Sequence, residues 1–353
     1  MFNHDLILGI LGGGQLEKMS AMSAAELGIK VIIYTDEQDA PASQVAYKTI
    51  NGALDDLEAL EQFAQHVDII TYEFENMPLE SIKHLQKFKP VLPDERLLEI
   101  SQHRIREKTF LNDLGIKTTN WHPVSRVEDV EKLFKETNQS AFIIKTNRFG
   151  YDGKGQVKVK IDQDFKKEFG SLKTTDLIAE EIVDFMAEIS VIVARDKTGR
   201  LVNYPPVVNE HKNHILHKTI APAEMPPEIL GKAIEAAYKV ANEIDLIGVL
   251  SVEYFVTAEG EVLANEIAPR PHNSGHWTID ACDFSQFDQH VRAVCALDVI
   301  PPYQHSKAEM INLIGDDVKE CDKYLRQEKT HLHLYGKKEI RPGRKMGHVT
   351  ILK

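Results

Sequence analysis

The hydrophobic pattern at the start of the chain predicts a β-α-β unit. Residues Leu6 to Leu11 form a continuous apolar run, as expected for a strand that is buried on both faces. Glycines follow at 12 to 14, then a helix-like stretch from 17 to 27 and a second strand from 30 to 34. Because strands joined in this way are parallel, we expect a Rossmann-like N-terminal domain.

The rest of the first 114 residues continues the same alternation. We predict a helix at 55 to 65, a strand at 68 to 73, a short strand at 91 to 93 and two helical stretches between 94 and 114. Gly115 closes this region, and residues 116 to 123 are typical of an extended connection. We therefore place the first domain at residues 1–114.

The pattern after residue 115 changes to hairpins and helices of an α+β unit at 115–306. The part at 115–185 is predicted as a smaller subdomain and the part at 186–306 as a larger one, with residues 307–353 as a small β-rich C-terminal domain. The predicted strands are 142–145, 156–160, 177–182, 187–195, 201–211, 248–256, 261–267, 310–314, 331–335 and 348–352; the predicted helices are 127–137, 164–170, 226–243 and 317–325.

Composition narrows the class of protein. The 353 residues are 42% hydrophobic and 27% charged, which is ordinary for a soluble protein of two or three domains. The net charge of -12 argues against a protein that coats nucleic acid, but a basic pocket for a phosphorylated metabolite remains compatible with it. We expect small-molecule partners and no nucleic acid.

The cysteines and the N-terminus predict a cytoplasmic protein. Three cysteines are an odd number without metal-ligand spacing, which indicates free thiols in a reducing compartment. The N-terminus lacks a basic region, and no apolar run approaches the ~18 residues that a membrane span needs. We expect neither a targeting segment nor a membrane contact.

A glycine-rich stretch, AFIIKTNRFGYDGKGQ at 141 to 156, is the first candidate for chemistry. It joins a strand carrying Lys145 to a loop with three glycines. Such loops let backbone N–H groups approach phosphate oxygens, and a lysine supplies charge. The stretch is not a P-loop and does not have the spacing G-x-G-x-x-G. By itself it would also fit a surface β-hairpin.

Polar residues at the ends of the N-terminal strands form a second candidate. Glu73 and Asn76 follow a predicted parallel strand, and the carboxyl ends of such strands face the ligand crevice. The alternative is that they cap the helix after Pro78. Asp36 fits the ribose-binding acid of an NAD-dependent enzyme, but nothing downstream supplies hydride chemistry.

The third candidate is a set of oxygen ligands on two late strands. Glu253 faces Glu266 across a predicted hairpin, and Asn265 precedes Glu266. Two carboxylates and an amide suit Mg²⁺, and a carboxylate within an apolar strand is costly unless it is paired or metal-bound. The alternative is a pair of surface acids on the hairpin.

The order of these residues resembles the ATP-grasp family. The resemblance implies two α+β units that clamp ATP as substrate, a lysine and glycine-rich lid on the phosphates, a hinge on the adenine and a late strand pair that holds Mg²⁺. The implied metal ligands are Glu253, Glu266 and Asn265. The implied ATP-binding residues are Arg104, Lys145, Gly150, Tyr151, Asp152, Gly153, Lys154, Gly155, Gln156, Glu180, Glu181, Ile182, Val183, Glu188, His211, Asn265 and Glu266.

Four further stretches resemble one branch of that family, which acts in bacterial and fungal purine biosynthesis. They are GGGQL at 12 to 16, EFEN at 73 to 76, APRPHNSGH at 268 to 276 and RPGRKMGH at 341 to 348. The implied reaction uses ATP and bicarbonate to carboxylate the exocyclic amine of 5-aminoimidazole ribonucleotide through carboxyphosphate. The branch also implies a homodimer.

The resemblance assigns roles to individual residues. Asp152 is the candidate for the amine proton. Lys337, Arg344 and Arg270 are assigned to the ribotide phosphate or to bicarbonate, although a solvated charged loop is the alternative for residues 337 to 345. The implied catalytic residues are Asp152, Tyr151, Lys154, Arg270, Lys337 and Arg344. The implied ribotide-binding residues are Gly13, Gln15, Leu16, Glu73, Asn76, His272, Asn273, Lys337 and Arg344.

Two other functions share parts of this pattern. A formate-dependent glycinamide ribonucleotide transformylase has the same clamp, but its members are longer and differ in the ribotide motifs. A non-catalytic nucleotide-binding protein is expected to lack one of the metal carboxylates, and both Glu253 and Glu266 are present.

Overall fold

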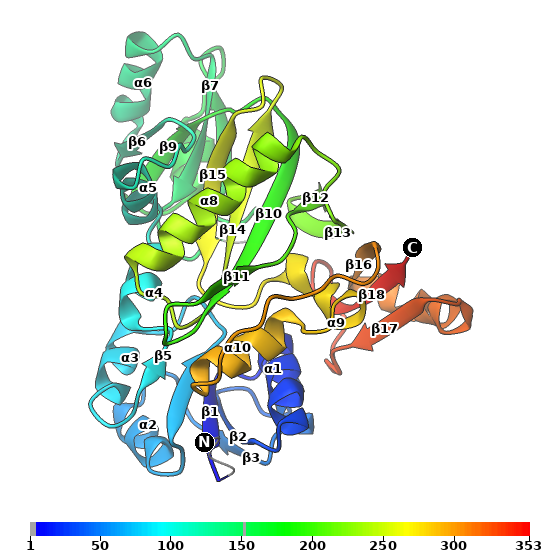
Figure 1. Cartoon of the computed structure of the whole chain (residues 1–353). Helices are drawn as coiled ribbons and strands as arrows, with labels where there is room; N and C mark the ends of the chain where they lie inside the picture. The colour runs from blue at the N-terminus through cyan, green and yellow to red at the C-terminus, as the bar shows by residue number, and fades with distance from the viewer. Residues whose placement is uncertain (1–4, 151–152) are drawn as a thin grey trace.

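The computed structural model describes residues 5–150 and 153–353, in which three sheets are arranged along the molecule (Figure 1). The first sheet contains five parallel strands in the order β3-β2-β1-β4-β5. These are β1 Ile7–Leu11, β2 Lys30–Thr35, β3 Lys48–Asn51, β4 Ile69–Tyr72 and β5 Val91–Leu92. The parallel N-terminal sheet predicted from the apolar runs is confirmed, and β3 is an addition to it.

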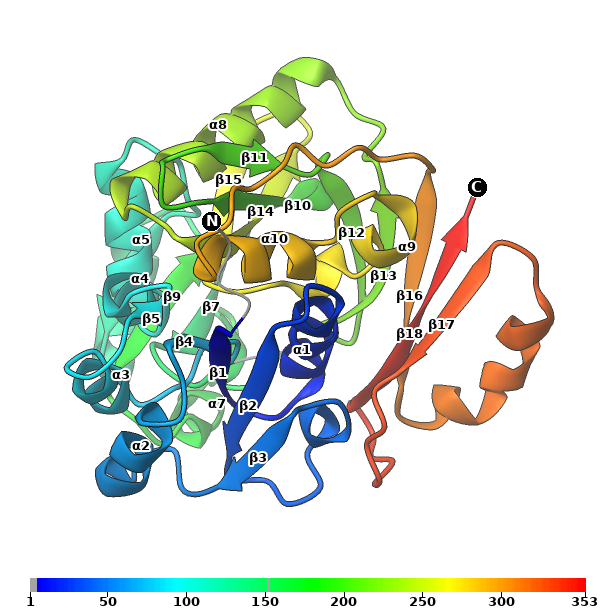
Figure 2. The same ribbon diagram turned by 60° about the horizontal axis from the view of Figure 1, so that its bottom comes forward.

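Helices cover both faces of this first sheet. They are α1 Gln15–Glu26, α2 Leu57–Ala64, α3 Leu79–Leu85 and α4 Glu95–Ser101, with the 3-10 turn η1 Pro41–Gln44. The next helix, α5 Arg104–Asp113, packs on the third sheet through Leu111. One face also packs against α10 Gln286–Val294, which comes from much later in the chain and lies beside α1 (Figure 2). Val291 and Val294 of α10 belong to the same core as Leu8 and Ile10 of β1, so this helix fixes the first sheet to the rest of the molecule.

The second sheet has four antiparallel strands in the order β6-β9-β7-β8. They are β6 Trp121–Val124, β7 Ala141–Thr146, β8 Gln156–Lys160 and β9 Leu177–Glu181, accompanied by α6 Val127–Glu136 and α7 Lys166–Ser171. Phe142 and Ile144 of β7 are buried against Phe134 of α6. Lys145 follows on the same strand, near the edge of this core.

The third sheet has nine strands, in the order β15-β14-β10-β12-β13-β16-β18-β17, with β11 beside β10. Its first strands are β10 Phe185–Arg195, β11 Leu201–Asn203, β12 Val207–Lys212, β13 Ile215–Ala221, β14 Gly248–Thr257 and β15 Val262–Ala268. The long helix α8 Pro227–Glu243 packs its alanine face on β10 and β14 (Figure 1).

Two expectations for this sheet are wrong. The single strand expected at 201–211 is split into β11 and β12, because Pro205 and Pro206 lie between them and cannot donate to the strand ladder. Strand β13 was not expected at all. Its side chains mix Leu216 and Ile220 with His217 and Lys218, so neither a clean alternation nor an apolar run marks it.

The C-terminal strands extend the third sheet and do not form one of their own. Strand β16 Ala308–Ile314 pairs with β13, and β18 Lys345–Leu352 and β17 Thr330–Leu334 continue outward. Residues Gly315–Arg326, expected to hold a helix at 317–325, form the 3-10 helix η3. The remaining elements are η2 Asn273–Gly275 and α9 Thr278–Ala281. Across the described ranges, no helix is long and apolar enough to cross a membrane.

Candidate active site

The glycine-rich loop joins β7 to β8, as predicted. Lys145 stands opposite Gln156 of β8 and Ile178 of β9, and the backbone N–H of Thr146 donates to the carbonyl of Gly155 at 2.8 Å. Gly155 has φ +72°, and a Cβ atom there would lie 2.6 Å from the Thr146 hydroxyl, so the turn requires glycine. Lys154 is exposed. The predicted site residues Tyr151 and Asp152 lie outside the described residues.

One buried carboxylate connects this loop to its surroundings. Glu180 accepts a hydrogen bond from Lys145 Nζ at 2.6 Å, and Lys108 Nζ lies 3.4 Å from its other oxygen. Burial opposes the charge, but the two lysines outweigh it and lower the pKa of Glu180 to about 2. Burial in turn lowers the pKa of Lys145. Lys108 was missed from the sequence because a lysine on an amphipathic helix normally lies in solvent.

The predicted hinge, residues 180 to 183, covers the end of β9 and the two residues after it. Glu181 accepts hydrogen bonds from the side-chain amides of Asn120 and Gln139 at 2.9 and 3.1 Å. Ile182 is exposed and Val183 half-buried. An exposed apolar side chain such as Ile182 suits the flat face of a nucleobase.

Glu188 and His211, both predicted nucleotide contacts, meet on neighbouring strands β10 and β12. Glu188 stands next to Asn209 in the strand register, and its Oε2 lies 2.9 Å from His211 Nδ1. Burial lowers the pKa of His211, but the hydrogen bond and charge of Glu188 outweigh burial and raise it overall. Glu188 and His211 therefore place a pair of charged side chains on the third sheet.

The predicted metal ligands lie on β14 and β15, where Glu253 pairs directly with Glu266. The register shifts after this pair, so Asn265 is an extra residue in β15. Ala264 and Ile267 both belong to the buried core under α8 because of this bulge, whereas Asn265 and Glu266 between them are only half-buried. The bulge therefore gives Asn265 and Glu266 a common face, which a regular strand would not do.

The electrostatics of this pair suit a cation. Burial and the charge of Glu266 raise the pKa of Glu253 to about 8. Asn265 Oδ1 is buried without a hydrogen-bond partner in the described part of the chain, and Arg104 Nη1 is 3.8 Å from Glu266. A divalent cation would relieve the repulsion and satisfy the amide oxygen, so the residues present fit Mg²⁺. The alternative of two solvated surface acids is wrong for Glu253, whose side chain is 15% exposed.

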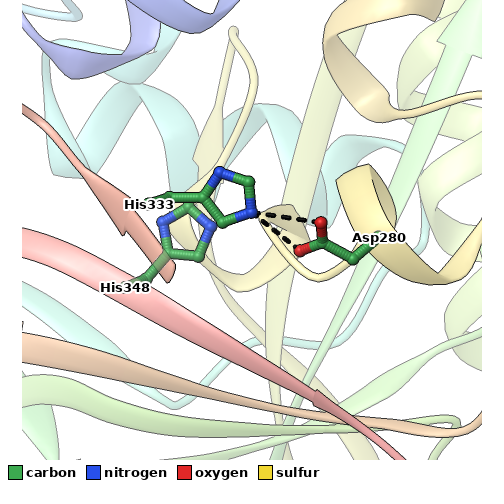
Figure 3. Close-up of side chains that lie close together, drawn as sticks. All are labelled: Asp280, His333 and His348. Carbon is green, nitrogen blue, oxygen red and sulfur yellow. Dashed lines mark hydrogen bonds and ion pairs between the residues drawn. The ribbon is translucent and has the colours of Figure 1, made fainter. Parts of the chain in front are cut away.

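A second cluster with metal-ligand atoms lies elsewhere, between α9 and the C-terminal strands. Asp280 accepts from His333 Nε2 through both oxygens, at 2.9 and 3.1 Å, and the His333 ring stacks on His348 (Figure 3). Its ligand atoms lie within 4.8 Å of one another. The hydrogen bonds account for the Asp280 and His333 geometry, and the cluster attaches the C-terminal strands to α9.

The ends of β1 and β4 form the predicted ribotide region. Glu73 is buried, and neither of its oxygens has a hydrogen-bond partner among residues 5–150 and 153–353. Glu17 of α1 is buried nearby; burial raises the pKa of Glu17 to about 7 and, with the charge of Glu17, raises the pKa of Glu73 well above its usual range. Helix α3 is capped by Pro78 without a side-chain hydrogen bond, so the capping alternative for Glu73 and Asn76 is wrong.

The stretch from 268 to 276 brings a cation to these acids. Arg270 donates from Nε to Glu75 Oε2 at 3.0 Å and from Nη2 to the same oxygen. Burial would lower the pKa of Arg270, but the charge and hydrogen bonds of Glu75 outweigh burial and raise the pKa of Arg270 overall. Asn273 is 9% exposed, and both polar atoms of its amide lack a hydrogen-bond partner within the described ranges. Glu17 and Glu75 were not assigned to the site from the sequence.

His272 connects the ribotide region with the metal ligands. Its Nε2 lies 3.4 Å from Glu253 Oε1, and its Nδ1 bonds the Ser274 hydroxyl at 2.8 Å. Burial and the charge of Arg270 lower the pKa of His272 well below its usual range. The imidazole is therefore neutral, and its contact with Glu253 is not an ion pair.

The basic C-terminal loop packs against the N-terminal domain. Lys18 Nζ donates to the Tyr335 carbonyl at 3.3 Å, and Gln44 Nε2 donates to that of Gly336 at 3.1 Å. Lys337 Nζ donates to the Lys345 carbonyl at 2.9 Å. Burial, with the charges of Arg344 and Lys345, lowers the pKa of Lys337 to about 8. Lys337, Arg344 and Lys345 are half-buried and do not fit the alternative of a solvated loop, whereas residues 338–343 between them are exposed, as that alternative expects.

The predicted site residues therefore fall into two adjoining groups. The nucleotide group surrounds Lys145, Glu180 and the Glu253–Glu266 pair, and the ribotide group surrounds Glu73 and Arg270. Gly13, Gln15 and Leu16 lie where β1 passes into α1, beside Glu17. The contact between His272 Nε2 and Glu253 Oε1, at 3.4 Å, joins the two groups.

Models of three families match successive parts of the chain. They are the ribonucleotide synthetase preATP-grasp domain at residues 6–102, the ATP-grasp domain at 109–287 and the phosphoribosylaminoimidazole carboxylase C-terminal domain at 308–353.

Curated relatives match over nearly the whole chain. An N5-carboxyaminoimidazole ribonucleotide synthase of Brucella melitensis is 44% identical, with 98% of this chain and 96% of the relative covered. The corresponding Bacillus subtilis protein is 41% identical, with 98% and 91% covered. A bifunctional purine synthesis protein of Dictyostelium discoideum is 42% identical over 97% of this chain, which spans only 36% of that relative's length.

Solved structures match equally well. An ADP complex of an N5-carboxyaminoimidazole ribonucleotide synthetase superimposes with a TM-score of 0.95 at 38% identity, over 100% of this chain and 93% of the other. The Aspergillus clavatus enzyme in complex with ADP and 5-aminoimidazole ribonucleotide superimposes with a TM-score of 0.92 at 29% identity, over 99% of this chain and 94% of the other.

Proposed function

The chain belongs to the N5-carboxyaminoimidazole ribonucleotide synthase family of ATP-grasp ligases, and we propose from this membership how its residues carry out the reaction. The enzyme carboxylates the exocyclic amine of 5-aminoimidazole ribonucleotide at the expense of ATP, in purine biosynthesis. Bicarbonate supplies the carboxyl group, and ADP and phosphate are released. The observation that carries the proposal is the meeting of the two groups of site residues, where His272 Nε2 of the ribotide group lies 3.4 Å from Glu253 Oε1 of the nucleotide group.

ATP binds between the second and third sheets in this proposal. Lys145 and Arg104 contact the phosphates, because Lys145 extends from the strand end before the glycine-rich loop and Arg104 Nη2 already reaches the Gly150 carbonyl at 3.3 Å. The segment from Glu181 to Val183 contacts the adenine through its backbone, and Glu188 with His211 contacts the ribose. Closure of the loop excludes water from the phosphates.

Magnesium is held by Glu253, Glu266 and Asn265 in the proposed site. When bound, it offsets the negative charge of the triphosphate during phosphoryl transfer. The support is the direct pairing of the two glutamates, the bulge at Asn265 and its unsatisfied buried oxygen.

The chemistry proceeds in two displacements. An oxygen of bicarbonate attacks the γ-phosphorus of ATP, the bond to ADP breaks, and carboxyphosphate forms. The amine nitrogen of the ribotide then attacks the carboxyl carbon, phosphate leaves, and the amine proton passes to a base, for which we propose Asp152. Arg270 stabilises the anionic groups as the carboxyl is transferred, held in place by Glu75.

The ribotide lies across the end of the first sheet. Its 5'-phosphate is bound by Lys337 and Arg344, since Lys337 interacts with Glu17 and Glu37 of the N-terminal domain and Arg344 is close enough to Lys337 to affect its pKa. Glu73 and Asn273, whose buried polar atoms have no partner in the described structure, receive the polar groups of the sugar and base. Gly13, Gln15, Leu16, Asn76 and His272 complete the pocket.

The wider organisation is also proposed from the family. We place the domains at 1–114, 115–306 and 307–353, with the last two sharing the third sheet, and we propose a cytoplasmic homodimer. Sedimentation of the purified protein tests the dimer.

The test of function is release of ADP in the presence of MgATP and bicarbonate, with and without 5-aminoimidazole ribonucleotide. Turnover that depends on the ribotide is expected. Glycinamide ribonucleotide with formate is the control, and turnover only with this pair would replace the proposal by the transformylase. Absence of turnover with either pair would indicate a non-catalytic nucleotide-binding protein.

A further inference from the structure

Lys108 is a fully buried lysine that the proposed mechanism does not use. Its side chain is 0% exposed, and its ammonium makes no hydrogen bond with any described residue. Among the described residues, the carboxylate in ion-pair contact with it is that of Glu180, with Nζ and Oε1 separated by 3.4 Å, and Glu107 interacts with it only over a longer distance. An ammonium in such a place is costly unless a nearby charge compensates it, so its relation to Glu180 needs an explanation.

Glu180 divides its two oxygens between two lysines. Oε2 accepts from Lys145 Nζ at 2.6 Å, and Oε1 faces Lys108. The two lysines differ in solvent exposure, because the side chain of Lys145 is 13% exposed whereas that of Lys108 is fully buried. Only Lys145 can therefore turn toward a bound phosphate.

Helix α5 fixes Lys108 relative to both halves of the nucleotide site. Arg104, Glu107 and Lys108 have the i, i+3, i+4 spacing that places side chains on one helix face. Arg104 approaches Glu266, and Glu107 Oε1 accepts from the backbone N–H of Ile267 at 2.6 Å, both on β15. Lys108 reaches β9 instead, so this face of α5 links the strand that carries the proposed metal ligands with the strand before the hinge.

We propose that Lys108 is a positioning residue that keeps the Glu180 carboxylate ionised and in place when Lys145 turns from it to the phosphates of the nucleotide. The inference rests on the proposed function of Lys145. Without Lys108, Lys145 would be the one cation among the described residues in ion-pair contact with Glu180, and Arg104 would act on it only from a longer distance. Nucleotide binding would then have to break the one contact that compensates a buried charge, so affinity would fall.

The test compares ADP affinity, measured by calorimetry, in four proteins: the wild type, K108M, E180Q and the double variant. Methionine matches the length of lysine without its charge. We expect K108M to weaken ADP binding at least about tenfold and to raise the KM for ATP, while the KM for the ribotide stays within about twofold. In the E180Q background the same K108M substitution should change ADP affinity less than about threefold, because the charge on which Lys108 acts is gone.

The control is K117M, which removes a lysine that is 67% exposed and paired with Glu261 on the surface; it should bind ADP as the wild type does. A K108M protein with a lower Tm but unchanged ADP affinity would overturn the inference and leave Lys108 a structural residue. An equal loss of affinity in the E180Q background would also overturn it. If K108M alone fails to fold, the comparison of E180Q with the double variant still tests the inference, because a loss of ADP affinity between these two proteins would overturn it.

ADP binding does not require the second substrate, so this test is separate from that of the function. A wild type that binds ADP but shows no ribotide-dependent turnover would refute the proposed reaction alone.

Discussion

The pH dependence of ribotide binding follows from the environment of Lys337. Burial and the neighbouring charges of Arg344 and Lys345 lower its pKa to about 8, while its Nζ remains hydrogen-bonded to the Lys345 carbonyl. The lowered pKa means that the ammonium is charged below about pH 8 and neutral above it. A phosphate is already a dianion across this range, so the change in charge belongs to the lysine.

The size of the effect follows from the fraction of Lys337 that is charged. With a pKa of about 8, roughly nine-tenths is charged at about pH 7 and roughly 3% at about pH 9.5. If only the charged form binds the 5'-phosphate, the KM for the ribotide rises on the order of 30-fold between these values. Bound phosphate would raise the lysine pKa, which makes this the upper bound.

The assay is the KM for 5-aminoimidazole ribonucleotide from about pH 6.5 to about pH 9.5, at saturating MgATP and bicarbonate. The KM for ATP, measured on the same samples, should lack the rise. K337R is the matched variant: arginine stays charged throughout, so its profile should be flat even if its absolute KM is higher. Equal pH profiles for K337R and the wild type would refute the assignment of Lys337 to the phosphate.

Three further predictions test other parts of the site. E253Q removes one of the two facing carboxylates, so it should weaken ADP binding in the presence of Mg²⁺ at least about tenfold and leave ADP binding without metal within about twofold of the wild type. Equal effects with and without Mg²⁺ would exclude Glu253 as a metal ligand. R270M should lower kcat by about 100-fold or more, since it removes the cation between the two groups of site residues, and steady-state kinetics showing an unchanged kcat would exclude that role. G155A should lower Tm by several degrees and raise the KM for ATP, because alanine is strained at φ +72° and its Cβ would meet Thr146. The control is G170A in α7, where a Cβ meets open space, and it should leave Tm unchanged or higher. Equal changes of Tm in the two variants would contradict the strain at Gly155.

The sequence predicted the parts of the fold that local patterns control. The apolar run at 6–11 and the glycines after it gave the first parallel unit, and Glu253 and Glu266 face each other across a hairpin, as predicted. The parallel direction of β1, β2, β4 and β5 follows from strand and helix alternation, whereas β3 at the edge of the sheet was not predicted. The pairing of β16 with β13 joins residues about ninety positions apart, and no local signal could have predicted it.

The site was predictable where polar residues interrupt apolar strands. Glu73, Lys145 and Glu266 stand out for this reason, because a charge in such a run requires a partner. Lys108 and Glu17 do not stand out, since both lie on helices whose polar positions normally face solvent and become buried only through packing with other units. The bulge that turns Asn265 toward Glu266 was equally hidden, because it depends on how β15 pairs with β14.

The central claim is that bicarbonate is activated by phosphoryl transfer from ATP before the amine is carboxylated. The most direct measurement uses bicarbonate labelled with ¹⁸O, together with MgATP and 5-aminoimidazole ribonucleotide, and mass spectrometry of the released phosphate. Because an oxygen of bicarbonate attacks the γ-phosphorus and stays there when carboxyphosphate breaks down, we expect one ¹⁸O atom in each phosphate. Phosphate without label, released at the rate of ribotide carboxylation, would contradict the account.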